Sequence, residues 1–395
     1  MTERLRIAMV ALDFHRQGGS EGRTGQLVDA LLASGHAVHL VGARIRGAWD
    51  PRTILHPLRT VSHPHWLEVL HFSRRAAALI EAGRFDVVHN QIRPFVPGIV
   101  TVGGGSHRFY LSEVLPRERG RLRAALRRVL PLHLVLLGLE RRGFRPERCP
   151  FLIANSQLCR AGILKHYPIP PERIVVAYNG VDSARFSPAS RSRHREAKRR
   201  DLGVGDGDLA VLFVGQGFSR KGLGTLLDAL GSLRLRGLPI RLIVVGRGGR
   251  GPWMAQAERL GLGGRVAFVG HVVDPEAFYA AADVFALPTF FDPFANATLE
   301  AMASGLPVVT SRSNGAAEVL RPGVDGLVID RADDVPGLAE ALASLTDPDV
   351  RAAMGERARE TAVKYGWEGA LEQTVAVYRA VVEERARAKG GRWRG

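Results

Sequence analysis

Short apolar runs rich in Val, Ile, Leu and Ala alternate with longer segments of helical periodicity through most of the chain. Near the N-terminus, "RIAMVALDF" is followed by the helical pattern "RTGQLVDALLASG", which stops at a glycine, and then by "AVHLVGA". This order is typical of a strand–helix–strand unit in a parallel α/β sheet. The apolar runs that continue the series are "FDVVHN" (85–90), "GIVTVGGG" (98–105), "FLIANS" (151–156) and "IVVAYNGVD" (174–182).

The alternation stops once and then resumes. Residues 183–208 are polar, basic and glycine-bearing, and they are followed by the runs "LAVLFVG", "IRLIVVG", "RVAFVG", "VFALP" and "LPVVTS". Because 395 residues also exceed one ordinary core, we predict two doubly wound α/β domains. The predicted division is a first domain over 1–182, a linker over 183–208, a second domain over 209–365, and a C-terminal helix over 366–395 that could cross back to the first domain and ends in a basic tail.

The chain is strongly basic, with 55 Lys and Arg against 39 Asp and Glu and a formal net charge of +16. Such a surface favours phosphate-rich partners: nucleic acid, anionic lipid, phosphorylated glycolipid or a nucleotide. Only Cys149 and Cys159 are present, so no disulfide framework is expected. The most apolar stretch, 129–139, is shorter than the roughly 20 residues of a membrane-spanning helix. We therefore expect a cytoplasmic protein.

Ligands of open parallel sheets bind beyond the carboxyl ends of the strands. Two such domains would face each other across a cleft, and we expect a small charged ligand there. In the second domain the loop "FVGQGFSRKG" carries Gly215 at a strand end, and Arg220 and Lys221 where a helix begins. Exposed helix amides and two cations are suited to a diphosphate. The alternative interpretation is a solvated basic turn.

A second glycine loop, "VVGRGGRG" (244–251), has the spacing G-x-G-x-x-G and begins at Gly246. A nicotinamide fingerprint is excluded, because the motif lies well inside the second domain and no acidic residue follows about 20 positions later. A close approach of this loop to a nucleotide remains the expectation.

The stretch "FFDPFANATLEAMASGLPVVTS" (290–311) places two carboxylates, Asp292 and Glu300, on either side of a helix start. An ionised carboxylate can accept hydrogen bonds from both hydroxyls of a vicinal diol, as in ribose and hexoses. The amides around Phe294, Ala295 and Asn296 can donate to hydroxyls or phosphate. Alternatively, Glu300 only stabilises the helix through its interaction with the helix dipole, and Asp292 is a turn residue.

Taken together, these motifs resemble the family 4 glycosyltransferases, retaining enzymes of the GT-B fold. The resemblance is carried by "RQGGSEG", "YNGVD", "VGQGFSRKG", "ADVFALPTFFDPFANATLEAMASGLPVV" and "YGWEGALEQTVAVYR", which span nearly the whole chain. Within the family, "VGQGFSRKG" and "LERRGFRPERCPFLIANSQLCRAGILKHYPIPPERI" are most similar to the lipopolysaccharide core glucosyltransferase I group. The resemblance implies two Rossmann-like domains, the first for the acceptor and the second for the nucleotide sugar.

The resemblance also implies roles for single residues. Glu300 would hold the ribose and Asp292 the transferred sugar. Gly18 and Gly19 would let the N-terminal loop approach the donor diphosphate without a side-chain clash. His107, in "TVGGGSH", resembles a histidine that other members place near the donor sugar and phosphate; the alternative is a surface-loop histidine.

Two positions depart from the family pattern. Gln216 stands where many members have an arginine directly after the strand glycine, so the diphosphate contacts would come from Arg220 and Lys221. The first acid of the signature is usually Glu, whereas this chain has Asp292, which is one methylene shorter. The second departure concerns the identity of the donor sugar more than the class of reaction.

The implied reaction moves a hexose, with glucose from UDP-glucose as the expected case, to a glycan or glycolipid acceptor. Lipopolysaccharide core synthesis or another cell-envelope polysaccharide pathway is the expected setting. No cofactor is expected besides the nucleotide-sugar substrate. No Asp-x-Asp motif follows a strand, and two cations can replace a metal ion, so we expect a metal-independent enzyme.

Two other functions are compatible with parts of the sequence. One is a nucleotide-sugar 2-epimerase of the same fold, which would bind the donor without an acceptor. The other is a nucleic-acid-binding protein, suggested by the basic composition. Nucleic-acid binders interleave basic and aromatic residues, but aromatic residues make up only 7% of this chain.

One segment of the first domain suggests contact with a membrane. Residues 113–148 contain ten arginines and four glutamates, and Leu and Val recur among the arginines at roughly helical spacing. A basic amphipathic segment suits an anionic membrane surface or phosphorylated sugars. Such a segment could hold the protein peripherally at the inner face of the cytoplasmic membrane. The alternative is a solvated pair of helices.

Overall fold

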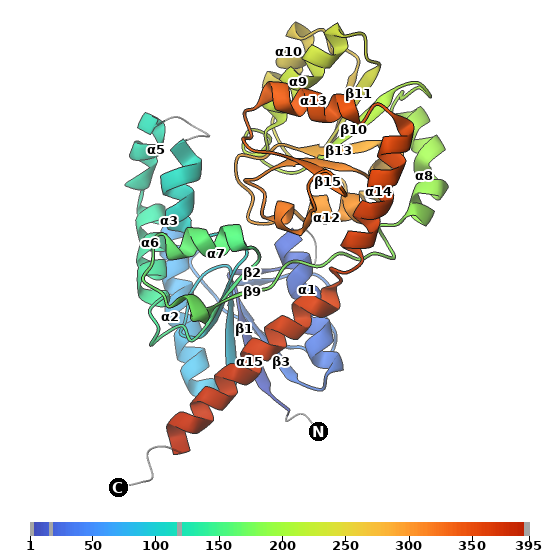
Figure 1. Cartoon of the computed structure of the whole chain (residues 1–395). Helices are drawn as coiled ribbons and strands as arrows, with labels where there is room; N and C mark the ends of the chain where they lie inside the picture. The colour runs from blue at the N-terminus through green and yellow to red at the C-terminus, as the bar shows by residue number, and fades with distance from the viewer. Residues whose placement is uncertain (1–3, 16–18, 117–120, 391–395) are drawn as a thin grey trace. The chain divides into compact units, whose positions relative to one another are not determined.

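The computed structural model describes residues 4–15, 19–116 and 121–390, which divide into two compact units. The first unit contains Met1–Tyr178 and Glu368–Gly395, and the second contains Asn179–Trp367 (Figure 1). Each unit is built on a parallel sheet with helices packed against it. The predicted fold class, two doubly wound parallel-sheet α/β domains, is therefore confirmed.

The strands of the first unit are β1 (Arg6–Val10), β2 (Asp13–Phe14), β3 (Ala37–Gly42), β4 (Arg44–Ile45), β5 (Ile54–Pro57), β6 (Val87–Gln91), β7 (Ile99–Val102), β8 (Leu152–Ala154) and β9 (Ile174–Val176). Among the described residues the main sheet has the order β5-β3-β1-β6-β7-β8-β9, with every neighbouring pair parallel. β2 pairs separately with β4. The order reverses between β1 and β6, as in doubly wound sheets.

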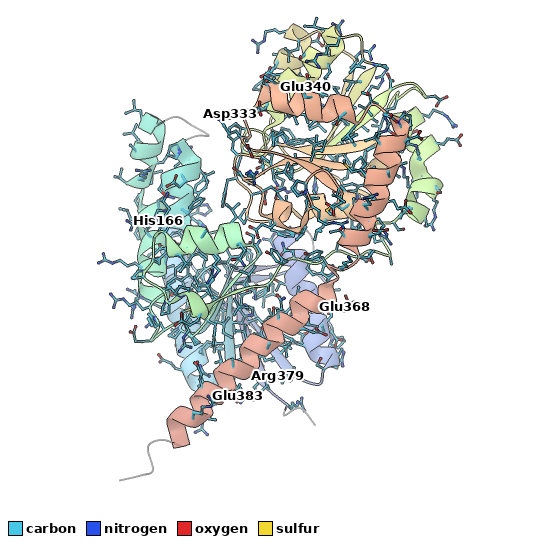
Figure 2. All side chains as sticks on the ribbon, viewed as in Figure 1. His166, Asp333, Glu340, Glu368, Arg379 and Glu383 are labelled. Carbon is cyan, nitrogen blue, oxygen red and sulfur yellow. The ribbon has the colours of Figure 1, made fainter. Side chains whose placement is uncertain are left out.

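The helical segments of the first unit are α1 (Gly19–Ala33), α2 (His65–Gly83), α3 (His107–Phe109), the π-helical turn η1 (Tyr110–Val114), α5 (Arg121–Arg128), α6 (Pro131–Gly143), α7 (Gln157–Leu164), the 3-10 turn η2 (Pro171–Arg173) and α15 (Trp367–Gly390). α15 starts at the last residue of the second unit, and the rest of it belongs to the first. Its Tyr378 is fully buried in the core around β1 and β3, and its hydroxyl lies 2.6 Å from Nδ1 of His89. Other α15 side chains, such as Glu368, Arg379 and Glu383, are exposed (Figure 2). The C-terminal helix is thus part of the first unit.

Among the described residues of the first unit, α5 and α6 are the helices that carry large apolar side chains more than half exposed. On α5, Leu122 is 77% exposed and Leu126 is 64% exposed, next to the exposed Arg127 and Arg128. On α6, Leu134 is exposed as well. In the part of the chain that the structure describes, no helix has both the length and the apolar character needed to cross a membrane.

The strands of the second unit are β10 (Leu209–Val214), β11 (Ile240–Val245), β12 (Val266–Gly270), β13 (Val284–Leu287), β14 (Val308–Ser311) and β15 (Gly326–Ile329). They form a parallel sheet in the order β12-β11-β10-β13-β14-β15. The two central strands, β10 and β13, are almost completely buried because helices cover both faces of the sheet.

The helical segments of the second unit are α8 (Pro188–Asp201), α9 (Leu223–Leu235), α10 (Gly251–Arg259), α11 (Glu276–Ala281), α12 (Asn296–Ala303), the 3-10 turn η3 (Gly315–Val319), α13 (Val335–Ser344) and α14 (Pro348–Ala362). α9 packs with α13, and α12 packs with α14. Figure 1 shows α13 and α14 on different sides of this sheet. Two of these helices begin at a capping residue directly followed by proline: α8 at Ser187–Pro188 and α14 at Asp347–Pro348.

The structure corrects the predicted linker over 183–208. This segment forms α8, which packs against α11 within the second unit. The side chain of Ser187 caps the helix by accepting from the Ser190 amide, and Pro188 occupies the first turn. The chain enters the second unit earlier than predicted, between Tyr178 and Asn179.

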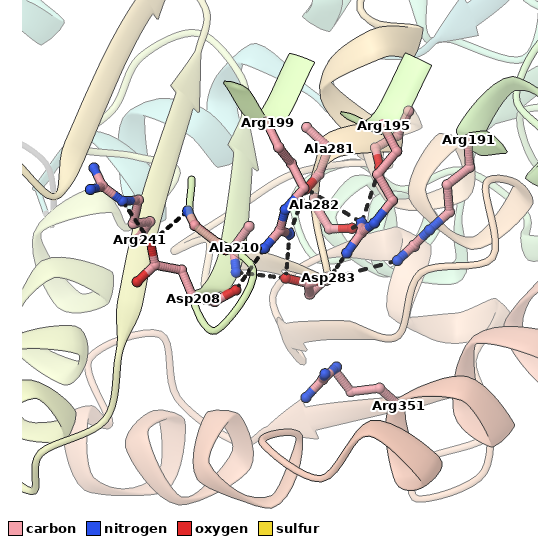
Figure 3. A network of polar contacts seen from close by, with 12 residues as sticks. Arg191, Arg195, Arg199, Asp208, Ala210, Arg241, Ala281, Ala282, Asp283 and Arg351 are labelled. Carbon is pink, nitrogen blue, oxygen red and sulfur yellow. Dashed lines mark hydrogen bonds and ion pairs between the residues drawn. The ribbon is translucent and has the colours of Figure 1, made fainter. Parts of the chain in front are cut away.

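Three arginines of α8 are held by one buried carboxylate (Figure 3). Arg195 Nη2 lies 2.5 Å from Asp283 Oδ1, Arg199 Nη1 lies 2.9 Å from Asp283 Oδ2, and Arg191 lies 3.7 Å from the same carboxylate. The Ala210 amide, at the start of β10, donates to Asp283 Oδ2 over 2.8 Å. The arginine-rich segment looks like a solvated linker in sequence, but it is an ion-paired helix because Asp283 supplies the opposite charge.

Candidate active site

The central strands of the second sheet end at its topological switch point. β10 and β13 are neighbours, and the chain continues from β10 to β11 on one side and from β13 to β14 on the other. The chain therefore leaves β10 and β13 toward opposite edges of the sheet, and the carboxyl ends of the strands at such a point are where open α/β sheets bind ligands. The loops that follow β10 and β13 contain Gly215–Gly222 and Pro288–Ala295, which include half of the residues predicted from sequence.

The two loops are joined by two hydrogen bonds to one backbone carbonyl and by one close packing contact. The Arg220 carbonyl accepts from the Phe290 amide at 2.9 Å and from Thr289 Oγ1 at 3.0 Å. Gly222, at φ +80°, ends the first loop, and a Cβ there would lie 1.9 Å from the Pro288 carbonyl oxygen. Only glycine fits this contact, so the start of α9 is fixed against the second loop.

Both predicted cations contact the first predicted carboxylate. Lys221 Nζ forms an ion pair with Asp292 Oδ2, and both side chains are only 9% exposed. Arg220 Nη1 lies 3.2 Å from the same oxygen and donates to the Phe291 carbonyl at 2.6 Å. Burial alone would raise the pKa of Asp292, but Lys221 and Arg220 outweigh it and hold that pKa below its ordinary value. Burial lowers the pKa of Lys221, against the opposite effect of Asp292.

The second carboxylate lies inside α12. Glu300 Oε2 accepts a hydrogen bond of 2.7 Å from the hydroxyl of Tyr279, which is fully buried on α11. Burial raises the pKa of Glu300, and the hydrogen bond from Tyr279 opposes this effect. The pKa of Tyr279 is raised well above its ordinary value, first by burial and then by the Glu300 charge. Tyr279 therefore stays protonated and fixes one oxygen of the carboxylate.

The start of α12 is bonded to neighbouring side chains. The Phe294 amide donates to Asp292 Oδ1 at 3.2 Å, and the Ala295 amide donates to Asn314 Oδ1 at 3.2 Å. Asn179 Nδ2 donates to Asn296 Oδ1 at 2.6 Å. The three positions predicted to contact a donor thus lie together here, and two of their amides have side-chain acceptors.

The two predicted glycines of the second unit contact each other. Gly246 has φ +141°, and a Cβ there would lie 1.8 Å from the Gly215 carbonyl oxygen. A Cβ on Gly215 would lie 3.2 Å from Cε of Lys221. Glycine at both positions allows β10 and β11 to end close together beside the lysine. This packing requires glycine at position 246, whereas a Cβ at position 215 would need only a small shift of the flexible Lys221 side chain.

The remaining predicted residues belong to the first unit. Gly18 lies outside the described residues, and Gly19 is the first residue of α1. His107 starts α3 and is buried; its Nε2 lies 2.9 Å from Nδ1 of His133 on α6, and its amide donates to Glu140 at 2.6 Å. The pKa of His107 is lowered to about 3, first by burial and then by the nearby charges of Arg93 and His133.

Three residues that contact the predicted site were not predicted as part of it. Asn179 lies in the motif "YNGVD", and Tyr279 lies just before "AADVF", so both stood next to a sequence signal. Asn314 lies in "SRSNGAAEV" and had no signal in the sequence. Across residues 4–15, 19–116 and 121–390, no three His, Cys, Asp or Glu side chains are grouped as metal ligands.

Both units match known protein families. Residues 17–185 match the family described as Glycosyltransferase Family 4, and residues 208–347 match the family described as Glycosyl transferases group 1. The D-inositol 3-phosphate glycosyltransferase of Pseudarthrobacter chlorophenolicus is 32% identical over 323 residues, which cover 76% of this chain and 72% of that protein. The protein of the same name from Corynebacterium urealyticum is 34% identical over 247 residues, but the match spans only 58% of its length and 60% of this chain.

Solved structures with the same fold cover nearly the whole chain. WaaG, a glycosyltransferase involved in lipopolysaccharide biosynthesis, has a TM-score of 0.80 and 24% identity over 94% of this chain and 99% of its own. Anabaena HepE in complex with UDP-glucose has a TM-score of 0.71 and 18% identity over 95% of this chain and 100% of its own. The fold is that of the GT-B glycosyltransferases. Both family descriptions match this chain, and the Pseudarthrobacter chlorophenolicus protein matches it over 72% of its own length. The chain therefore belongs to the family 4 glycosyltransferases.

Proposed function

We propose that the protein transfers a hexosyl group from a nucleoside diphosphate sugar to a hydroxyl group of a glycan or glycolipid. Arg220 and Lys221 pair with Asp292 where β10 and β13 end, and Glu300 lies close enough to interact electrostatically with Lys221. This arrangement is the observation that supports the proposal most directly. Two cations suit a diphosphate, and the carboxylates suit the hydroxyls of ribose and hexose.

The proposed donor is UDP-glucose. HepE has this fold and was solved with UDP-glucose bound. In this chain Glu300 would accept from the ribose hydroxyls with the carboxylate oxygen that Tyr279 does not fix. Asp292 would hold the transferred sugar. Because Asp292 is already paired with Lys221 and Arg220, a bound diphosphate would share these cations with it.

The chemical role of the cations follows from the leaving group. Negative charge grows on the diphosphate as the glycosidic bond breaks, and Arg220 and Lys221 would stabilise it. A preorganised donor of this kind contributes roughly 3–4 kcal/mol to the transition state. We propose that these cations act without a metal ion and that the anomeric configuration is retained. The departing diphosphate would itself take the proton of the acceptor hydroxyl.

The acceptor is proposed to bind to the first unit. His107, which belongs to this unit, is the candidate there for a residue near the transferred sugar and the phosphate of the donor. WaaG, described as acting in lipopolysaccharide biosynthesis, makes a lipopolysaccharide core sugar one candidate acceptor. The relatives named for D-inositol 3-phosphate make a phosphorylated polyol a second. A nucleotide-sugar 2-epimerase is the alternative reaction, and incubation with the nucleotide sugar alone separates the two because only the epimerase converts it to the 2-epimer.

A thermal-shift screen across nucleotide sugars tests the donor, because a cognate donor stabilises only the folded protein. We expect the largest shift with UDP-glucose. Lys221→Met should lower turnover with the selected donor by about a hundredfold, and Lys198→Met on α8 is the matched control that should leave it unchanged. If no nucleotide sugar shifts the melting temperature, the proposed function is wrong.

We also propose that α5 and α6 bind the surface of an anionic membrane. Leu122 and Leu126 are mostly exposed beside Arg127 and Arg128, a combination that suits a lipid interface. Leu122→Ser with Leu126→Ser should reduce binding to phosphatidylglycerol vesicles. Leu235→Ser, at a leucine of the second unit that is 81% exposed, is the control. Equal vesicle binding by the double variant and the control would contradict this proposal.

A further inference from the structure

Asn314 lies between β14 and η3, directly beside the loop that carries Asp292. Its side chain is almost completely buried, at 1% exposure. The backbones of the two residues form a parallel β-bridge. The Asp292 amide donates to the Ser313 carbonyl at 2.9 Å, and the Gly315 amide donates to the Asp292 carbonyl at 2.8 Å. The backbone of Asp292 is therefore fixed by the segment that contains Asn314.

The side-chain amide of Asn314 makes hydrogen bonds through both of its polar atoms. Oδ1 accepts from the Ala295 amide at 3.2 Å and from the Ala316 amide at 3.1 Å. Nδ2 donates to Thr298 Oγ1 and to Thr310 Oγ1, each at 3.0 Å. A carboxamide is suited to this place because it offers two donors and two acceptors, whereas a carboxylate cannot donate and an apolar side chain can do neither.

These bonds join three elements around the predicted donor site. Ala295 immediately precedes α12, and Thr298 lies in the first turn of that helix. Thr310 belongs to β14 and donates in turn to the carbonyl of Leu287, the last residue of β13. Asn314 thus links the end of β13, the end of β14 and the start of α12 through buried bonds.

We propose that Asn314 is a positioning residue that holds Asp292 and the start of α12 in the arrangement that binds the sugar of the donor. This inference rests on the proposed function. Asn314 itself touches neither Lys221 nor Glu300 through a hydrogen bond or ion pair. It acts by fixing the backbone from which Asp292 reaches the transferred sugar.

The test compares a sugar nucleotide with its own nucleoside diphosphate. The probes are the donor selected by the thermal-shift screen, expected to be UDP-glucose, and the matching diphosphate, expected to be UDP. Asn314→Leu should weaken binding of the sugar nucleotide about tenfold more than binding of the diphosphate. This difference is expected because the sugar depends on Asp292, while the diphosphate depends mainly on the cations. Isothermal titration measures both affinities.

A milder pair of variants keeps the proposal testable if Asn314→Leu does not fold. Thr298→Val removes one acceptor of the Asn314 amide with little change of volume, whereas Thr298→Ser keeps it. We expect Thr298→Val to shift the ratio of the two affinities in the same direction by about threefold, and Thr298→Ser to leave it unchanged.

A buried asparagine of the first unit is the control for lost stability. Asn90 donates to the Val96 and Ile99 carbonyls at 2.9 and 3.2 Å and accepts from the Val96 amide at 3.1 Å. Asn90→Leu should lower the melting temperature without changing the affinity ratio. If Asn314→Leu and Thr298→Val also keep the wild-type ratio, Asn314 has only a structural role. If wild-type protein binds no sugar nucleotide, the proposed function itself fails.

Discussion

Lys221 and Asp292 form a buried ion pair in which each charge compensates the other. Lys221→Met would leave the Asp292 carboxylate to Arg220 alone, so we expect the free energy of unfolding to fall by about 3 kcal/mol. In the double variant with Asp292→Asn no such unpaired charge is buried. Its loss should be smaller than the sum of the two single losses by at least about 1 kcal/mol. Urea unfolding of the four proteins measures this, and simple additivity would contradict the buried pair.

His107 should make the first unit sensitive to acid. Its pKa is lowered from 6.5 to about 3, mainly by burial, so between these values the unfolded chain binds a proton that the folded chain does not. The stability that His107 contributes is therefore lost as the pH falls from 6.5 toward 3. His107→Gln removes this effect. Between pH 7 and pH 5 the variant should lose about 1 kcal/mol less than wild type, allowing for solvent screening.

Urea unfolding at the two pH values provides the measurement for His107. Equal losses in wild type and variant would show that the pKa of His107 is not lowered in the folded protein. His107 contacts His133 and Glu140, both on α6, so neutral His107 is a property of the packing between α3 and α6.

The sequence predicted some residues of the candidate site and not others, for physical reasons. Asp292 and Glu300 could be placed on either side of a helix start because their spacing and the neighbouring Pro and Asn are local signals. Arg220 and Lys221 were predicted between the end of a strand and the start of a helix, and they lie there. Their pairing with Asp292 could not be predicted, because it depends on how two distant loops pack. Asn314 was missed for the same reason.

At the level of elements, α8 shows how composition can mislead. Its arginines suggest a solvated linker, but Arg191, Arg195 and Arg199 recur every four residues and therefore share one helix face. Together with the Ser187–Pro188 start, this spacing is a signal for a helix. The opposite charge, Asp283, lies on a distant part of the chain, so the burial of this face could not be predicted locally.

Asp283→Asn tests whether α8 is an integral part of the second unit. The substitution would leave Arg195 and the buried Arg199 without their counter-charge, and we expect a loss of about 3 kcal/mol in the free energy of unfolding. Glu196→Gln, at an exposed position of the same helix, is the control and should change stability by less than about 0.5 kcal/mol. If both variants are equally mild when unfolded with urea, the helix is not anchored by Asp283.

For the whole molecule, the repeated alternation of strands and helices was enough to predict two doubly wound sheets. The boundary between the units could not be predicted, because it falls between Tyr178 and Asn179, where the composition of the sequence does not change. The chain enters the second unit at Asn179 and leaves it after Trp367. Close to these two points, the Val181 amide donates to the Tyr365 carbonyl at 2.9 Å. The first and last segments of the second unit thus lie side by side.

The proposed function requires that a nucleoside diphosphate binds where β10 and β13 end, with its ribose held by Glu300. Titration of wild type and Glu300→Ala with UDP and with 2′-deoxy-UDP tests this directly, with the exposed Glu356→Ala on α14 as the control. We predict that wild type and the control bind UDP about tenfold more tightly than the deoxy compound, and that Glu300→Ala binds both equally. A preference for UDP that persists in Glu300→Ala would contradict the account.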